Sequence, residues 1–244
     1  MRTFEFSTPE LAVLVQHMTG GVLQLDAAAV ADLDSSEDGL ASAEEQLRDR
    51  GLLVSAPLEE EAAVSSQLAP VLRCALDPDV LGIMRVERRT ATGTTPDVSY
   101  YSFTDECMVH NRVDARGNHV FTEFGSIDEV LSALTATAAH AGSSGASAEP
   151  LESLLPVSDS VNLLLMVAGT GGPDAATQAT SWVIARDAVW LVDRRDNDGL
   201  PMAIATTGDD LRAALLDALQ GETQLVFGQR NGTALHQGGS AWPM

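Results

Sequence analysis

The side chains with the greatest chemical potential are His110, His119 and Glu123, which fall on neighbouring strand-like segments. Imidazole and carboxylate groups bind metals and carry protons in acid–base catalysis. Successive residues of a strand point to opposite faces of a sheet, so His110 and His119 need not lie on the same face. We therefore expect polar cross-strand contacts on a sheet surface, and no metal site.

Two further motifs match only part of a known ligand site. Gly169-Thr170-Gly171-Gly172 follows an apolar run, but the third glycine and the helix that receive a dinucleotide pyrophosphate do not follow it. Asp196-Asn197-Asp198-Gly199 resembles part of a calcium loop, yet Arg194 and Ala205 stand where acidic ligands belong. Both motifs predict turns.

The basic residues and the cysteines exclude further chemistry. All 14 basic residues are arginine, which rules out a phosphate-loop lysine and a lysine Schiff base. Cys74 and Cys107 are predicted to be two buried thiols, with a disulfide between them left open. Glu106 should raise the pKa of the neighbouring Cys107 thiol and make it unreactive. We predict a protein without catalytic residues, cofactor or metal.

Charge and composition restrict the partners. The net charge of −21 repels nucleic-acid phosphates and anionic membrane surfaces, so neither is an expected partner. The chain contains no run approaching the roughly 20 apolar residues of a membrane span, and Met1–Phe6 has no apolar signal core. We expect a cytoplasmic protein.

Periodicity and capping motifs predict the elements of the first half. Ser7-Thr8-Pro9-Glu10 is a capping box before an apolar stripe, and Ser42-Ala43-Glu44-Glu45 is a second candidate box. A third helix is expected over about 58–76, followed by a meander and a closing helix over about 127–139. The expected strands are Val80–Arg89, Val98–Thr104, Cys107–Val113 and His119–Phe124, with Ala91–Asp97 as a long hairpin loop.

The second half follows a similar order after a Gly/Ser-rich stretch. A helical turn near 151–155 is followed by strands, by a helix over about 209–219, and by a hairpin around Asn231-Gly232. The expected strands are Val161–Ala168, Thr180–Ala185, Ala188–Asp193 and Pro201–Ala205.

Residues 98–138 and 179–219 resemble two copies of one unit at an offset of 81 positions. The shift places the helix start at Ser126 on Thr207, and the apolar pair Val130 and Leu134 on Leu211 and Leu215. Identities are few, so the shared pattern carries the comparison. We predict an α+β fold of two pseudo-symmetric halves, each an antiparallel sheet with packed helices. The predicted halves are residues 1–140 and 151–244, joined by a linker at 141–150.

The order of elements and two motifs resemble the EspG family, cytosolic chaperones of type VII secretion. The motifs are Leu47-Arg48-Asp49-Arg50-Gly51-Leu52-Leu53 and the helix-to-sheet junction Leu68–Pro78. The resemblance implies a non-enzymatic scaffold that binds a helical PE–PPE-like secretion substrate. By position, the loop at 91–97 matches a partner-binding loop of that family, which makes Thr92, Thr94, Thr95 and Asp97 the candidate partner-binding residues.

Two other hypotheses remain open at the level of sequence. The chain could be a small-ligand binder or an enzyme with a cleft between the halves, using residues such as His110 and Glu123. It could also pair with a second copy through a sheet edge, such as the strand that contains Thr233, to form a homo-dimer.

Overall fold

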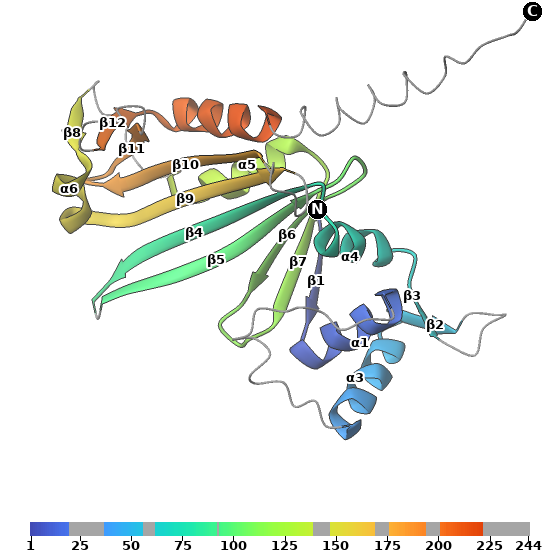
Figure 1. The fold of residues 1–244 in the computed structure, drawn as a ribbon. Helices are drawn as coiled ribbons and strands as arrows, with labels where there is room; N and C mark the ends of the chain where they lie inside the picture. Colours follow the sequence, from blue (N-terminus) through green and yellow to red (C-terminus); the bar gives the residue numbers. More distant parts are fainter. Residues whose placement is uncertain are drawn as a thin grey trace, which may run out of the picture. The chain divides into compact units, whose positions relative to one another are not determined.

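The computed structural model describes residues 1–19, 37–55, 62–91, 93–138, 147–168, 176–193 and 201–221. The chain forms two compact units, each built from separate stretches of sequence (Figure 1). Unit 1 contains Met1–Asp77 and Cys107–Phe124, and unit 2 contains Pro78–Glu106 and Gly125–Met244.

Unit 1 combines helices with a short antiparallel sheet. The sheet runs in the order β1 (Arg2–Phe6), β7 (His119–Phe124) and β6 (Met108–Val113). Its apolar core gathers fully buried side chains from helices and sheet, among them Phe6, Leu14, Leu47 and Leu72. The other elements of unit 1 are α1 (Thr8–Thr19), α3 (Glu37–Asp49), α4 (Ala69–Leu76) and the pair β2 (Leu53–Ser55) and β3 (Ala62–Val64).

Unit 2 is organised around antiparallel strands in the order β5-β4-β9-β10-β11-β12-β8. Two long strands, β4 and β9, pair from Val80 opposite Ala168 to Arg88 opposite Ser160. The bounds are β4 (Val80–Thr90), β5 (Gly93–Phe103), β8 (Ala148–Pro150), β9 (Ser158–Ala168), β10 (Ala176–Ala185), β11 (Ala188–Asp193) and β12 (Met202–Thr206). The helices are α5 (Ile127–Thr135), α6 (Leu151–Leu154) and a helix at 208–221, with short 3-10 turns η1 (Ala136–Ala138) and η2 (Leu155–Val157).

The two faces of the unit 2 sheet differ because side chains alternate along β4 and β9. One face carries buried residues such as Val80, Met84, Leu164 and Met166. Helix α5 and the helix at 208–221 lie on this side (Figure 1) and contact each other through an Arg212–Asp128 ion pair of 2.7 Å. Their apolar stripes are buried with the sheet, with Val130, Leu134, Leu211 and Leu215 all at most 2% exposed.

The two helices start at Ser126 and Thr207, 81 positions apart as the sequence predicts, and each of these hydroxyls caps its helix. The backbone N–H of Glu129 donates to Ser126 Oγ (3.3 Å), and that of Asp210 donates to Thr207 Oγ1 (3.0 Å). The Asp210 carboxylate in turn accepts from the Thr207 backbone N–H (3.3 Å). The chain order of four strands and a helix is also repeated, from β4 to α5 and from β9 to the helix at 208–221. Whether this reflects duplication stays a prediction.

The predicted α+β class is confirmed, and several predicted elements are placed as expected. The first capping box opens α1, where the Ser7 backbone N–H donates to Glu10 Oε2 (2.8 Å). Gly51, at φ +68°, takes the left-handed position after α3. The predicted halves 1–140 and 151–244 are not tested. Ala148–Pro150, at the end of the predicted linker, forms β8.

Other predictions were wrong in type or extent. The helix expected over 58–76 is in fact β3 and the shorter α4, because Pro70 suits the first turn of a helix that starts at Ala69. Helix α3 begins at Glu37, so the candidate box at Ser42 lies inside it. Strand β1 was missed.

Three predicted motifs lie outside the described residues: the glycine motif at 169–172, the turn at 196–199 and the hairpin around Asn231. Among the helices in the described ranges, none is long and apolar enough to cross a membrane.

Among the glycines in the described ranges, Gly82 has the least space for a side chain and gives a stability test. A Cβ at this position would lie 3.1 Å from Met166 Sδ and 3.3 Å from Tyr101 Cβ. We expect Gly82→Val to lower the free energy of unfolding by about 2 kcal/mol through overpacking. A Cβ at Gly208 would meet no atom of a non-neighbouring residue within 4 Å, so Gly208→Ala should be neutral or stabilising. Urea unfolding measures both, and equal effects would contradict this packing.

His119 gives a pH test of unit 1. It is 4% exposed, and burial lowers the pKa of its imidazole below the usual 6.5. The folded state therefore favours the neutral ring, and this contribution is complete above about pH 6.5 and lost as the pH falls below it. We expect the melting temperature of the wild type to fall more steeply from pH 7 to pH 5 than that of His119→Phe. If the melting temperatures of the two proteins depend on pH in the same way, the lowered pKa assigned to buried His119 is contradicted.

Candidate functional site

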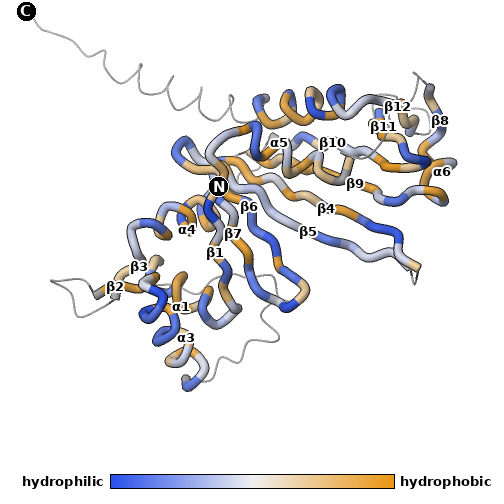
Figure 2. The backbone as a smooth tube through the Cα atoms, turned by 180° about the vertical axis from the view of Figure 1, so that it is seen from behind, coloured by the Kyte–Doolittle hydropathy of each residue, from blue (hydrophilic) through white to orange (hydrophobic). Residues whose placement is uncertain are grey.

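The predicted partner-binding segment forms part of a long hairpin, which corrects its assignment as a loop. Strands β4 and β5 pair along their whole length, from Val80 opposite Phe103 to Thr90 opposite Gly93. The predicted loop residues from Gly93 onward therefore belong to a strand. Threonines 94 and 95 are β-branched and favour extended backbone, which explains why this polar stretch is a strand. Its exposed first half, Gly93–Asp97, is hydrophilic, whereas β4 and β9 carry hydrophobic stretches (Figure 2).

The structure separates the predicted residues between the two faces of the hairpin. Thr94 lies opposite Arg89, and Thr95 lies opposite Arg88. Thr95 and Asp97 therefore share one face, where Asp97 Oδ2 accepts from Arg88 Nη1 at 2.9 Å. Thr94 lies on the other face. Thr92 lies outside the described residues. Thr94, Thr95 and Asp97 are all exposed.

The face that carries Thr94 continues across the sheet as an apolar surface. We call it the open face and define it by Leu81, Ile83, Arg85, Glu87, Leu163 and Leu165. The register places Ile83 opposite Leu165 and Arg85 opposite Leu163. The four aliphatic side chains are only half-buried, in contrast to the residues of the opposite face. Val98, opposite Arg85 on β5, is 41% exposed.

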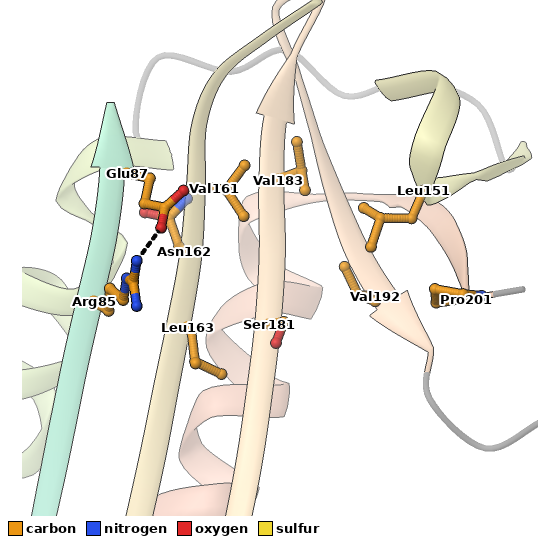
Figure 3. Close-up of a pocket in the computed structure, with 10 residues that line it drawn as sticks. All are labelled: Arg85, Glu87, Leu151, Val161, Asn162, Leu163, Ser181, Val183, Val192 and Pro201. Atoms are coloured by element: carbon orange, nitrogen blue, oxygen red, sulfur yellow. Dashed lines mark hydrogen bonds and ion pairs between the residues drawn. The ribbon is translucent and has the colours of Figure 1, made fainter. Parts of the chain in front are cut away.

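A hollow of about 360 Å³ lies at one end of the open face (Figure 3). Its charged members are Arg85 and Glu87, which form an ion pair on β4. Leu151 from α6 and Pro201 lie across from this pair, next to Val192 (Figure 3). Between them the strands supply a mainly apolar floor of Val161, Leu163 and Val183, with polar groups from Ser181 and Asn162. The chemistry of this hollow favours apolar groups, with a polar contact at one side.

The tip of the hairpin is tied to the segment that follows α6. Arg89 Nη1 donates to the backbone oxygen of Pro156 in η2. The residues on either side of this proline, Leu155 and Val157, are 42% and 45% exposed. Exposed aliphatic side chains next to the hollow enlarge the apolar area that a partner could cover.

The histidine and glutamate candidates for chemistry are not brought together. His119 and Glu123 lie on one face of β7, whereas His110 pairs with Thr122 and lies on the other. The rings of His110 and Phe124 stack at 6.4 Å, and Glu123 forms an ion pair with Arg2. Within the described ranges, no group of three His, Cys, Asp or Glu side chains is placed to hold a metal ion.

Sequence reasoning missed the aliphatic residues that define the open face. It predicted the strands that contain Leu163 and Leu165, but the apolar run from Leu163 to Ala168 shows no alternation. A continuous apolar strand is typical of burial on both faces. The signal that could have found this surface is the charged pair Arg85 and Glu87, which alternates with buried Met84 and Val86 on β4.

One of the comparisons with known proteins, that with solved structures, identifies a similar fold. No protein-family model matches the sequence, and no curated protein matches it. The structure is similar to the Mycobacterium tuberculosis type VII secretion system chaperone EspG5, solved in complex with a PE25–PPE41 dimer. The TM-score is 0.59 at 10% sequence identity, and the match covers 90% of this chain and 96% of that chain.

The chain therefore has an α+β, EspG-like fold, as the sequence resemblance implies. At 10% identity the likeness concerns the fold, and the partner named with EspG5 belongs to that protein.

Proposed function

We propose that this chain is a chaperone-like protein that binds a helical secretion substrate of the PE–PPE type. The observation that carries the proposal is the open face, an apolar sheet surface whose aliphatic residues are half-buried on an EspG-like fold. An exposed apolar surface bordered by charged residues is typical of a protein-binding site.

The dimensions and chemistry of the surface favour protein over a small molecule as ligand. The hollow is part of a wider surface that runs from Leu81 along β4 and includes exposed Val98. Its two charged groups, Arg85 and Glu87, already neutralise each other. An amphipathic helix binds such a surface by burying an apolar stripe, with polar contacts at the rim.

The hairpin residues contribute the rim of the proposed site. Thr94 lies on the face that continues into the open face, and Thr95 and Asp97 lie on the opposite face of the same strand. We propose that a partner contacts Thr94 directly, while Thr95 and Asp97 contact it only if it folds around the hairpin. Thr92, outside the described residues, stays a proposed contact of the same partner. We further propose that the protein acts in the cytoplasm, without a catalytic step. A homo-dimer stays a prediction.

A pair of exposed valines tests the location of the site. Val98→Asp places a charge beside the open face, and we expect it to weaken binding of a PE–PPE-type heterodimer from the source genome at least about 10-fold. The matched control is Val113→Asp on β6 of unit 1, where the valine is 49% exposed. Isothermal titration calorimetry with purified proteins measures both affinities.

The possible outcomes test the position of the binding site and the class of partner separately. Equal losses in the two variants would place the binding site elsewhere. No detectable binding by the wild type would contradict the proposed partner class.

A second matched pair, Thr94→Arg and Thr95→Arg, compares the two faces of the hairpin at adjacent positions. We expect the larger loss of affinity from Thr94→Arg.

A further inference from the structure

The two cysteines of the chain are neighbours in unit 1, although 33 positions separate them in sequence. Cys74 lies on α4, and Cys107 lies immediately before β6. The Cys74 thiol donates to the backbone oxygen of Cys107 at 3.3 Å, which places the two side chains beside each other. Their exposed fractions are 1% and 8%, so both are buried and Cys107 is the more exposed of the two.

The surroundings of Cys107 favour its thiolate. The hydrogen bond from the Cys74 thiol is the main cause that holds the pKa of Cys107 below its ordinary value, against the opposing effect of burial. The Arg2 guanidinium and the Met108 backbone N–H act in the same direction, and Glu123 opposes them. The sequence-based expectation of a raised pKa for this thiol was therefore wrong, because the net shift is downward. The thiolate is the reactive form of cysteine.

The position of the pair in the chain gives a disulfide a specific structural effect. Between the two cysteines the chain leaves unit 1 at Asp77 and returns to it at Cys107. The enclosed stretch, Pro78–Glu106, contains the entire β4–β5 hairpin. A bond between the two sulfurs would close this stretch into a covalent loop at the base of the hairpin.

We propose that Cys74 and Cys107 form a reversible intramolecular disulfide, which makes the base of the β4–β5 hairpin a redox-sensitive modification site. The oxidant is a low-molecular-weight disulfide. The Cys107 thiolate attacks one of its sulfurs, the S–S bond of the oxidant breaks, and one small thiolate leaves. The Cys74 sulfur, having lost its proton to solvent, then attacks the Cys107 sulfur and displaces the second small thiolate. The two displaced thiolates take up the two protons that the protein loses.

The direct test is oxidation of the native protein with glutathione disulfide, followed by intact-mass analysis and maleimide counting of thiols under denaturing conditions. We expect a mass loss of about 2 Da with loss of both thiols, reversed by a dithiol reductant. Because the bond closes a loop in the unfolded chain, the melting temperature should rise by roughly 5 °C or more.

Two single variants identify the order of attack. In Cys74→Ser, Cys107 should accumulate a stable mixed disulfide with glutathione, whereas in Cys107→Ser the buried Cys74 should react much more slowly. The proposal is overturned if the native wild type keeps both thiols while the urea-unfolded chain closes readily. It is equally overturned if the wild type stops at the mixed disulfide, or if closure lowers the melting temperature. These measurements require no binding partner, so their outcome is independent of the proposed function.

Discussion

The antiparallel pairing of β4 with β9 is the interaction on which unit 2 depends. It joins strands about 80 positions apart in the chain, from Val80 opposite Ala168 to Arg88 opposite Ser160. Each strand also pairs on its other side, β4 with β5 and β9 with β10. Both strands are therefore fully hydrogen-bonded in the sheet, and a shift by one residue would exchange the two faces. The register consequently determines which residues meet the helices and which form the open face.

The same register explains why a binding surface and a stable core can share two strands. On one face, Leu164 and Met166 pack under α5 and the helix at 208–221, which bury their own apolar stripes there. On the other face, Leu163 and Leu165 are only half-buried. A partner that covers them removes further apolar area from water, which contributes roughly 25 cal/mol per Å² before the costs of association. Affinity on this face therefore does not require disruption of the core.

The sequence predicted those elements whose signals are local. The capping box at Ser7 depends on residues three positions apart and is present in the structure, and the helix start predicted at Thr207 is capped by that hydroxyl. The α+β class was predicted because the spacing of apolar residues changes after Pro78 from the period of a helix to that of a strand. By contrast, the boundary of β5 also depends on its partner strand, because the β-branched Thr94 and Thr95 favour extended backbone and pair with Arg89 and Arg88. The separation of His110 from His119 likewise follows from strand register, which composition and spacing do not encode.

The central claim is that the open face of unit 2 binds a helical protein, and hydrogen–deuterium exchange of the native chain tests it most directly. The chain would be measured alone and with a saturating PE–PPE-type heterodimer. We expect slower exchange in β5 from Gly93 to Val98, and in α6 and η2, whose backbone amides lie next to the open face. The sheet of unit 1 should be unchanged. Complex formation with protection confined to unit 1 would contradict the account.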